Sequence, residues 1–159
     1  MANQRGSIAL TAAEIDDYLA AARTIVLATI GADGQPHLSA MWFAYDTGRL
    51  LMWTYGKSQK VRNIERDPRV TCLVEDGDTY GTLRGSSVTG RATVRSDAAL
   101  VRRVWELNHA KYQGRSITAD DEASFALQAP KRVVIDIEPL HVASWDHRKL
   151  PVPPSPPVT

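Results

Sequence analysis

The chain has a single cysteine, Cys72, among its 159 residues. One cysteine cannot form an internal disulfide, and it cannot supply the paired thiolates of a cysteine-type zinc site. Cys72 alternates with Val70 and Val74 in the segment RVTCLVE. This period-2 pattern predicts a buried thiol on a β-strand and favours that interpretation over a reactive nucleophile.

The sequence also lacks an excess of charge of either sign, with 19 basic and 18 acidic residues and a formal net charge of +1. A chain without a strong net field is not expected to hold nucleic acid or an anionic membrane surface. No run of about 18 apolar residues could span a bilayer, and the first residues lack the pattern of a signal peptide. We therefore expect a cytoplasmic protein in which any anion site is formed locally.

Common catalytic signatures are missing as well. No GxGxxG, GxxxxGK[ST] or GxSxG pattern occurs, which argues against the usual nucleotide-binding and serine hydrolase classes. The histidines show no HExxH or similar metal-ligand spacing, so no metal site is expected. These histidines are His37, His109, His141 and His147.

Short β-branched segments separated by turn signals occupy most of the chain. Asp33-Gly34 separates TIVLATI from QPHLSAMWFAY, and a DTG turn leads into RLLMWTY. Three consecutive strands joined by short turns predict an antiparallel meander, because parallel neighbours need a long crossover. Gly85 and Gly90 predict bulges or bends inside a later long strand. The remaining predicted strands are RVTCLVE, YGTLRGSSVTGRATVR, KRVVIDIEP and HVASW.

Three further segments have helical periodicity and capping residues. Thr11 and Glu14 have capping-box spacing at the start of the first helix, and Thr118 and Asp121 repeat it before a short helix. Ser96 is the predicted cap of the helix between them. Few helices and many strands in hairpin order predict a mainly β fold, an antiparallel barrel that is closed or half-closed. We expect one domain over residues 1–150 and an extended, proline-rich tail over residues 151–159.

The segment GKSQK gathers cationic and hydroxyl groups where another short helix is predicted to begin. Ser58 stands at the N-cap position, and Pro68 cannot continue the helix that follows it. A helix N-terminus offers free N–H groups and a partial positive charge, so Ser58, Gln59 and Lys60 could bind a phosphate with Lys57 beside it. The alternative is an ordinary solvated helix face, and spacing alone leaves both interpretations open.

Residues 24–150 resemble a known protein family. The LATI-x-x-DGQPH hairpin, the W-x-x-x-x-x-G-x-L hairpin and the ordered pattern T-x-x-x-S-x-K-x-x-N-I-x-R-D-P-R-V carry the resemblance. They are similar to the pyridoxamine phosphate oxidase-like split β-barrel family of flavin- and deazaflavin-dependent oxidoreductases. The later segments EDGDTYGTLRG and SWDHRKL resemble an actinobacterial branch in which coenzyme F-420 is a frequent cofactor, while other branches use FMN.

The resemblance implies a six- to seven-stranded antiparallel split barrel of the FMN-binding type, with flanking helices. It also implies a homodimer with a cofactor at each end of the subunit interface. Ser58 and Lys60 would hold the cofactor phosphate near Thr54, and the backbone of residues 39–41 would meet the ring. Trp53 or Trp145 would lie at the ring, and Trp145 and Arg148 would reach the cofactor of the other subunit. The implied cofactor-binding residues are Ser39, Ala40, Met41, Trp53, Thr54, Lys57, Ser58, Gln59, Lys60, Trp145 and Arg148.

The implied function is hydride transfer between bound coenzyme F-420, or FMN as the alternative, and a small electron-poor organic substrate. The longer anionic tail of F-420 favours extra cations, for which Lys57, Lys60, Arg62 and Arg84 are candidates. Because the chemistry belongs to the cofactor, no side chain is needed as a nucleophile. The candidate proton donors, which the sequence does not rank, are Tyr55, Tyr80 and His147.

Other functions remain open at this stage. Vitamin B6 oxidation is not expected, because the full arginine-rich substrate signature of a true pyridoxamine phosphate oxidase is missing. A non-catalytic protein that stores, carries or senses a flavin, F-420 or another planar ligand such as haem would carry the same anion site. A scaffold dimer without any small ligand ranks last, because phosphate-binding residue types stand in the family's order.

Overall fold

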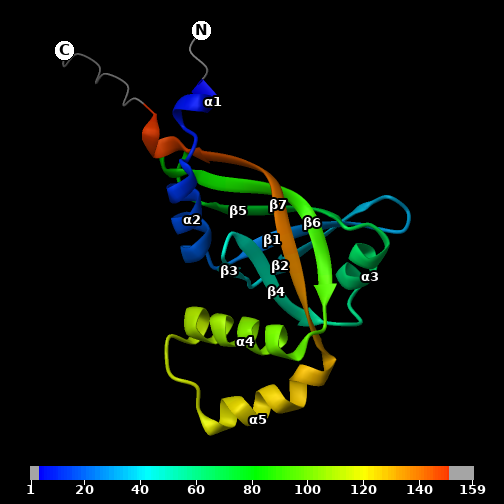
Figure 1. The fold of residues 1–159 in the computed structure, drawn as a ribbon. Helices are drawn as coiled ribbons and strands as arrows, with labels where there is room; N and C mark the ends of the chain where they lie inside the picture. The colour runs from blue at the N-terminus through cyan, green and yellow to red at the C-terminus, as the bar shows by residue number, and fades with distance from the viewer. Residues whose placement is uncertain (1–3, 151–159) are drawn as a thin grey trace, which may run out of the picture.

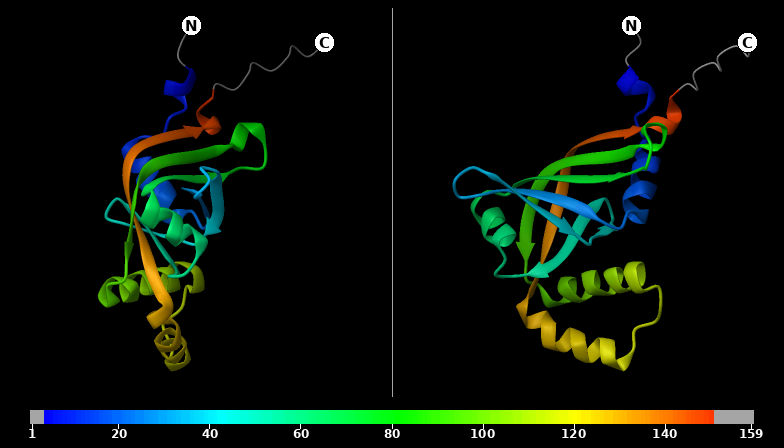
Figure 2. Two further views of the ribbon diagram at one scale, coloured as in Figure 1. Left: turned by 90° about the vertical axis from the view of Figure 1, so that its right-hand side faces the viewer. Right: turned by 180° about the vertical axis from the view of Figure 1, so that it is seen from behind.

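Seven antiparallel strands form one strongly curled sheet in a computed structural model that describes residues 4–150 (Figures 1 and 2). The order across the sheet is β2-β1-β5-β6-β7-β4-β3. The prediction of a mainly β split barrel with flanking helices is confirmed. The predicted tail over residues 151–159 lies outside the described residues. The strands are β1 (Ile25–Ile30), β2 (Pro36–Met41), β3 (Ala44–Asp46), β4 (Arg49–Tyr55), β5 (Arg69–Asp76), β6 (Arg84–Arg95) and β7 (Arg132–Asp146).

Helices cover the open sides of the half-barrel. In Figure 1, α2 and α3 lie on opposite sides of the sheet, and α4 and α5 form a hairpin beneath the ends of β4 and β7. The helices are α1 (Gln4–Ser7), α2 (Ala12–Ala21), α3 (Gln59–Arg66), α4 (Ala98–Gln113) and α5 (Ala119–Gln128), with 3₁₀ turns η1 (Tyr80–Thr82), η2 (Ala129–Lys131) and η3 (His147–Lys149). No described helix is long and apolar enough to cross a membrane.

The capping residues act largely as predicted. Thr11 and Thr118 each form the expected capping box, with Glu14 and Asp121 respectively. The predicted cap of α4 was wrong by one residue, because Asp97 rather than Ser96 is the N-cap. Its carboxylate accepts a hydrogen bond from the backbone N–H of Leu100 at 2.8 Å.

The predicted meander is wrong. β1 pairs with β2, and β3 pairs with β4, but β2 and β3 are the two opposite edges of the sheet. The chain leaves the sheet between them at Trp42 and Phe43. Phe43 is fully buried, and its backbone N–H donates to the Tyr112 hydroxyl at 2.9 Å. Burial of Phe43 therefore ends one hairpin and starts another.

The two predicted C-terminal strands are one continuous strand, β7. Its pairing with β6 shifts register between Thr89 and Gly90, opposite Pro139. A Cβ at Gly90 would lie 2.4 Å from the carbonyl oxygen of Glu138. The predicted bulge at Gly90 is therefore present, because only glycine fits this close approach of two backbones.

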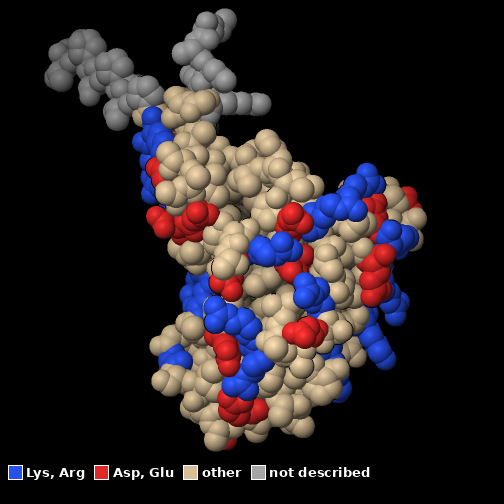
Figure 3. Space-filling model, in the orientation of Figure 1, with Lys and Arg blue, Asp and Glu red and all other residues tan. Residues whose placement is uncertain are grey.

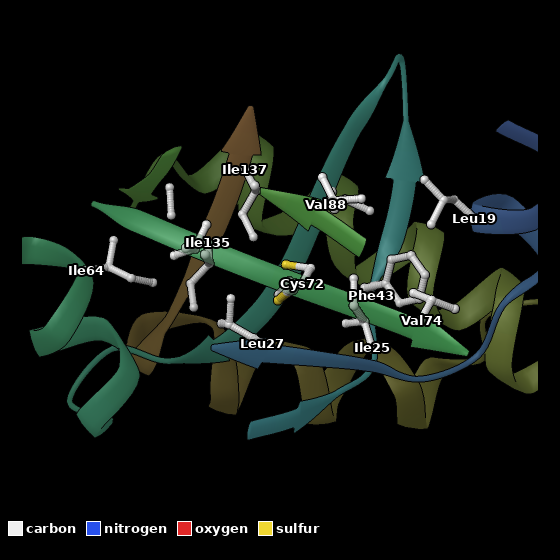
Figure 4. Packing of buried hydrophobic residues seen from close by; sticks show 14 of the residues in the cluster. Leu19, Ile25, Leu27, Phe43, Ile64, Cys72, Val74, Val88, Ile135 and Ile137 are labelled. Carbon is white, nitrogen blue, oxygen red and sulfur yellow. The ribbon is translucent and has the colours of Figure 1, made fainter. Parts of the chain in front are cut away.

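The main hydrophobic core fills the inside of the half-barrel (Figure 4). Cys72 lies in it, fully buried, and desolvation raises the pKa of its thiol to about 12. The prediction of a buried strand thiol is thus confirmed. Along β4, Leu50 and Met52 enter this core, whereas Leu51 and Trp53 pack in a second cluster with α4 and α5. One face of β4 therefore packs in the half-barrel core, and the other packs against α4 and α5.

Candidate functional site

The start of α3 lies directly after the last paired residues of β4. Tyr55 pairs with Arg132 of β7, and the Gly56 N–H donates to the Lys131 carbonyl at 3.0 Å. The Ser58 carbonyl accepts the N–H groups of Val61 at 3.1 Å and Arg62 at 3.3 Å. The N–H groups of Gln59 and Lys60 precede these first helical bonds and have no acceptor within the helix. The sheet thus places a helix N-terminus at a fixed point.

The Ser58 hydroxyl is available for a ligand. Ser58 is the N-cap as predicted, but its side chain makes no capping hydrogen bond. Its Oγ is buried and has no partner within the described part of the chain. A buried hydroxyl without a partner costs free energy, so it requires an explanation. An oxygen-rich anion beside the free amides of Gln59 and Lys60 would accept a hydrogen bond from this hydroxyl.

Lys60 supplies a cation at the same place. It is partly buried, and this burial lowers the pKa of its ammonium group. Among residues 4–150, no carboxylate forms an ion pair with it. A bound phosphate would compensate the lost hydration and restore the charged form. Lys57 is exposed one residue before Ser58, so it can add charge at the rim of the site.

A buried polar network anchors α3 to the first hairpin. The Asn63 side chain is fully buried and donates from Nδ2 to the Thr29 hydroxyl at 3.0 Å. Its Oδ1 accepts from Gln59 Nε2 at 2.8 Å and from Arg66 at 3.2 Å. The Gln59 side chain is therefore already engaged, and only its main-chain N–H faces the candidate anion site. No local sequence signal reveals this role of Asn63, because its partner Thr29 is 34 residues away.

Thr54 and Trp53 lie on opposite faces of β4. Thr54 is 5% exposed on the face of the main core, two residues before the turn into α3. Trp53 belongs to the cluster beneath α4 and α5. The Arg132 guanidinium lies 4.5 Å from the centre of the Trp53 ring, and the indole Nε1 is buried without an acceptor in the described residues. Within one chain, Trp53 therefore faces the helical layer.

Residues 39–41 belong to β2, an edge of the sheet. Ser39 pairs with Leu27 and Met41 with Ile25 of β1. The other side of β2 has no strand partner in the described sheet, so half of its backbone groups point outward. An edge strand of this kind can offer N–H and C=O groups to a flat ligand.

Trp145 and Arg148 lie far from α3 in the same chain. Trp145 is 13 residues beyond Arg132 on β7, which corresponds to about 40 Å of strand. Its ring packs on Gly85, where an added Cβ would lie 2.3 Å from Trp145 Cζ2. Arg148 pairs with the buried carboxylate of Asp146, with Nε to Oδ1 at 2.8 Å. That ion pair lowers the pKa of Asp146.

The candidate proton donors separate between the two ends of the molecule. Tyr55 is 43% exposed and adjoins the turn into α3. Tyr80 and His147 meet at the far end, where His147 Nδ1 lies 2.7 Å from the Tyr80 carbonyl oxygen. Only Tyr55 therefore lies beside the α3 site of its own chain. Among residues 4–150, no group of three or more His, Cys, Asp or Glu residues could hold a metal ion.

Charge is otherwise evenly spread over the face seen in Figure 3, where cationic and anionic side chains are intermixed. Arg84, one of the candidate cations for a long anionic cofactor tail, forms an ion pair with Asp76 at 2.7 Å. Its charge is therefore already paired. Lys60 at the start of α3, unlike Arg84, has no ion-pair partner among the described residues. An anion would therefore be held by a local arrangement, as the near-zero net charge suggested.

The chain is similar in sequence to known proteins. The family described as "Pyridoxamine 5'-phosphate oxidase" matches residues 11–146. An "F420H(2)-dependent biliverdin reductase" of Mycobacterium tuberculosis (strain CDC 1551 / Oshkosh) is 32% identical over 123 residues, which cover 76% of this chain and 78% of that protein.

Solved structures show the same fold. The crystal structure of the conserved hypothetical protein Rv2991 from Mycobacterium tuberculosis matches with a TM-score of 0.86 and 44% identity, covering 93% of both chains. A structure named "F420 Reductase" matches with a TM-score of 0.61 and 29% identity, covering 80% of this chain and 94% of the other. Of the two relatives named for F420, one is thus similar to this chain in sequence and the other in both sequence and fold.

Proposed function

Because the chain belongs to the pyridoxamine 5'-phosphate oxidase family, we propose that it is an oxidoreductase that binds coenzyme F-420 in preference to FMN. The start of α3 is the observation that carries the proposal. The Ser58 hydroxyl, the N–H groups of Gln59 and Lys60, and the Lys60 ammonium form a donor set without an internal acceptor. Such a set fits a phosphate, which both cofactors carry.

Two relatives named for F-420 favour the deazaflavin over FMN. When bound, the cofactor supplies the hydride that reduces an electron-poor substrate, so the protein needs no nucleophile of its own. Ser58 and Lys60 would hold the phosphate, and Lys57 would add charge beside it. The unpaired edge of β2 over residues 39–41 would orient the ring. Tyr55 is the candidate proton donor closest in sequence to this site.

We propose that the working form is a homodimer. An uncovered sheet face carries a row of small and apolar side chains that runs across five strands. These residues are Ala40, Val26, Leu73, Ser87 and Ala143, which are neighbours in register. Leu38 and Leu73 on this face are 64% and 37% exposed. A contiguous apolar surface of this kind is typical of a protein interface.

The dimer also explains the distance between the two ends of the proposed site. Trp145 lies about 40 Å along β7 from Arg132, the residue that pairs with Tyr55 just before α3, and Arg148 lies three residues further on. A two-fold related copy brings different parts of the same surface together. Trp145 and Arg148 would then act on the cofactor held by α3 of the partner subunit.

The proposal is tested by fluorescence titration of the protein with F-420 and, separately, with FMN. We expect one site per chain, tighter for F-420, that Lys60→Ala weakens by about tenfold or more. Arg91→Ala is the matched control, since Arg91 is an exposed cation on β6, and it should change the affinity by less than about twofold. Failure of both cofactors to bind, or an equal loss in both variants, would refute the proposed site.

Turnover separates an enzyme from a carrier. Reduced F-420 is mixed with the protein and biliverdin, the substrate named for the mycobacterial relative, and its oxidation is followed by absorbance. An oxidoreductase oxidises the cofactor faster with acceptor than without it. Tight binding with no acceptor-dependent oxidation of this probe would favour a carrier or a different acceptor class.

A further inference from the structure

A hollow beside the GKS turn is lined by Gly56 and Lys57 of that turn. Its volume is about 750 Å³, and it opens between the ends of β4 and β7 and the helices α4 and α5. In Figures 1 and 2 these elements meet at the lower end of the molecule. Pockets of roughly 300–1,000 Å³ are typical of sites for small organic ligands. Neither Ser58 nor Lys60 lines this hollow.

The lining of the pocket is mostly apolar. Its walls include Val101 of α4, Phe125 of α5, and Pro130 and Val133 near the start of β7. Phe125 is held in place by Trp105, with ring centres 4.6 Å apart. A ligand that fills this space must therefore present an apolar body, which gains free energy by leaving water.

The charged residues of the pocket are all cationic. Lys57, Lys131 and Arg132 line it, and no aspartate or glutamate does. None of the three forms an ion pair with a carboxylate of residues 4–150. Arg132 is held over the Trp53 ring and donates to the Gln128 side-chain oxygen at 2.9 Å. The adjacent Asp97 is engaged as the N-cap of α4.

We propose that this pocket binds an organic anion with an apolar body, such as an aromatic or long-chain carboxylate, as a site separate from the cofactor phosphate site. The apolar walls exclude a small inorganic ion as the preferred ligand, and the three cations disfavour a neutral one. Lys57 lies between the two sites and can contact ligands in both. The assignment does not rest on the proposed function, because it can be tested without any cofactor.

Two fluorescent probes that differ mainly in charge test the chemistry. Anilinonaphthalene sulfonate carries one negative charge, and N-phenylnaphthylamine is a neutral molecule with similar rings. We expect saturable binding of one sulfonate probe per chain, with the neutral probe at least about tenfold weaker. Arg132→Gln should weaken the sulfonate probe by about tenfold and Lys131→Gln by about threefold. Equal affinity for both probes would overturn the assignment to an anion.

A filling variant tests the location without removing a core residue. Ala126 is exposed and lines the pocket, so Ala126→Phe should block both probes. Ala123→Phe, on the same helix and outside the lining, is its control and should leave binding within about twofold of wild type. Unchanged binding in Ala126→Phe, or equal loss in both variants, would overturn the location.

Independence from the α3 site is tested with the same probe. Lys60→Ala should leave the affinity for the sulfonate probe within about twofold of wild type. Saturation with F-420 or FMN should leave the probe bound. Stoichiometric displacement of the probe by either cofactor would overturn the claim that the pocket is a separate site. Failure of both cofactors to bind would refute the proposed function alone and leave the probe result standing.

Discussion

The side-chain amide of Asn63 donates a hydrogen bond to the Thr29 hydroxyl at 3.0 Å and so joins α3 to β1. Both residues are buried. Thr29 in turn donates to the His37 carbonyl of β2 at 3.3 Å. The position of the α3 N-terminus relative to the edge strand therefore depends on this chain of bonds. Buried polar groups of this kind contribute chiefly when every member has a partner.

Asn63→Ala should destabilise the protein by about 2 kcal/mol, because it leaves buried partners unsatisfied. It should also weaken cofactor binding, since the helix start is no longer held. Arg62→Ala is the control on the same helix, where an exposed substitution is expected to cost less than about 0.5 kcal/mol. Urea unfolding measures both variants. Equal midpoints for the two would show that the network does not hold the helix.

Ser58→Ala should behave unlike an ordinary N-cap substitution. Removing an N-cap hydroxyl commonly costs about 1 kcal/mol, and Thr11→Ala should show that loss, because Thr11 accepts from the Glu14 N–H. The Ser58 hydroxyl makes no such bond. We expect the unliganded Ser58→Ala protein to unfold at the wild-type urea concentration while binding F-420 more weakly. A destabilisation as large as that of Thr11→Ala would contradict this account.

The sequence predicted those elements whose geometry is set by neighbouring residues, such as helix caps and tight turns. Thr11 and Thr118 begin helices because their hydroxyls and the acids three residues later satisfy the first free N–H groups. Gly34 adopts a positive φ of 83° in the first hairpin turn, as the Asp-Gly pair predicted. The place of Ser58 at the start of α3 follows from the same kind of signal.

Long-range pairing was not predictable in this way. QPHLSAMWFAY reads as one strand, since no local signal shows that Phe43 turns into the core. The two hairpins therefore seemed adjacent, although four strands separate β2 from β4 and five separate it from β3 at the other edge. Likewise, the continuous path of β7 separates Trp145 from α3 within one chain, which residue types alone do not reveal. The pocket beneath α4 and α5 also depends on this tertiary packing.

If the uncovered sheet face is the dimer interface, a single charged residue introduced on it should separate the two subunits. Leu73 lies in the middle of the apolar row, so Leu73→Glu would bury a carboxylate between two subunits. We expect light scattering after gel filtration to give a dimer mass for wild type and a monomer mass for this variant. Leu127→Glu, at a 78% exposed position on α5, should remain dimeric. A monomeric wild type would refute the proposed interface.

Lys111 predicts an unusual dependence of stability on pH. Its ammonium group donates to the Phe43 carbonyl at 3.2 Å and lies 4.0 Å from the centre of the Phe43 ring. Burial, with the Arg23 guanidinium as the smaller cause, lowers the pKa of Lys111 to about 8. A lysine in an unfolded chain titrates near pH ~10.4. Between these values the unfolded chain binds more protons than the folded one, so stability rises with pH.

We therefore expect Lys111 to contribute an increase in the free energy of unfolding from pH ~8 to ~9.5, by less than the maximum of about 1.4 kcal/mol per pH unit for one proton. This contribution is the difference between wild type and Lys111→Met, because the buried thiol of Cys72, whose pKa is raised to about 12, makes stability fall with pH in both proteins. Lys111→Met keeps the apolar stem and removes the charge, so it should abolish this increase, whereas Lys131→Met at an exposed position should not. Urea unfolding at several pH values below 10 measures the slope. Higher pH is avoided because burial raises the pKa of Tyr18 and Tyr45 to about 12, and a tyrosine that ionises first in the unfolded chain makes stability fall as pH rises. Equal slopes in wild type and Lys111→Met would show that Lys111 does not contribute to the pH dependence.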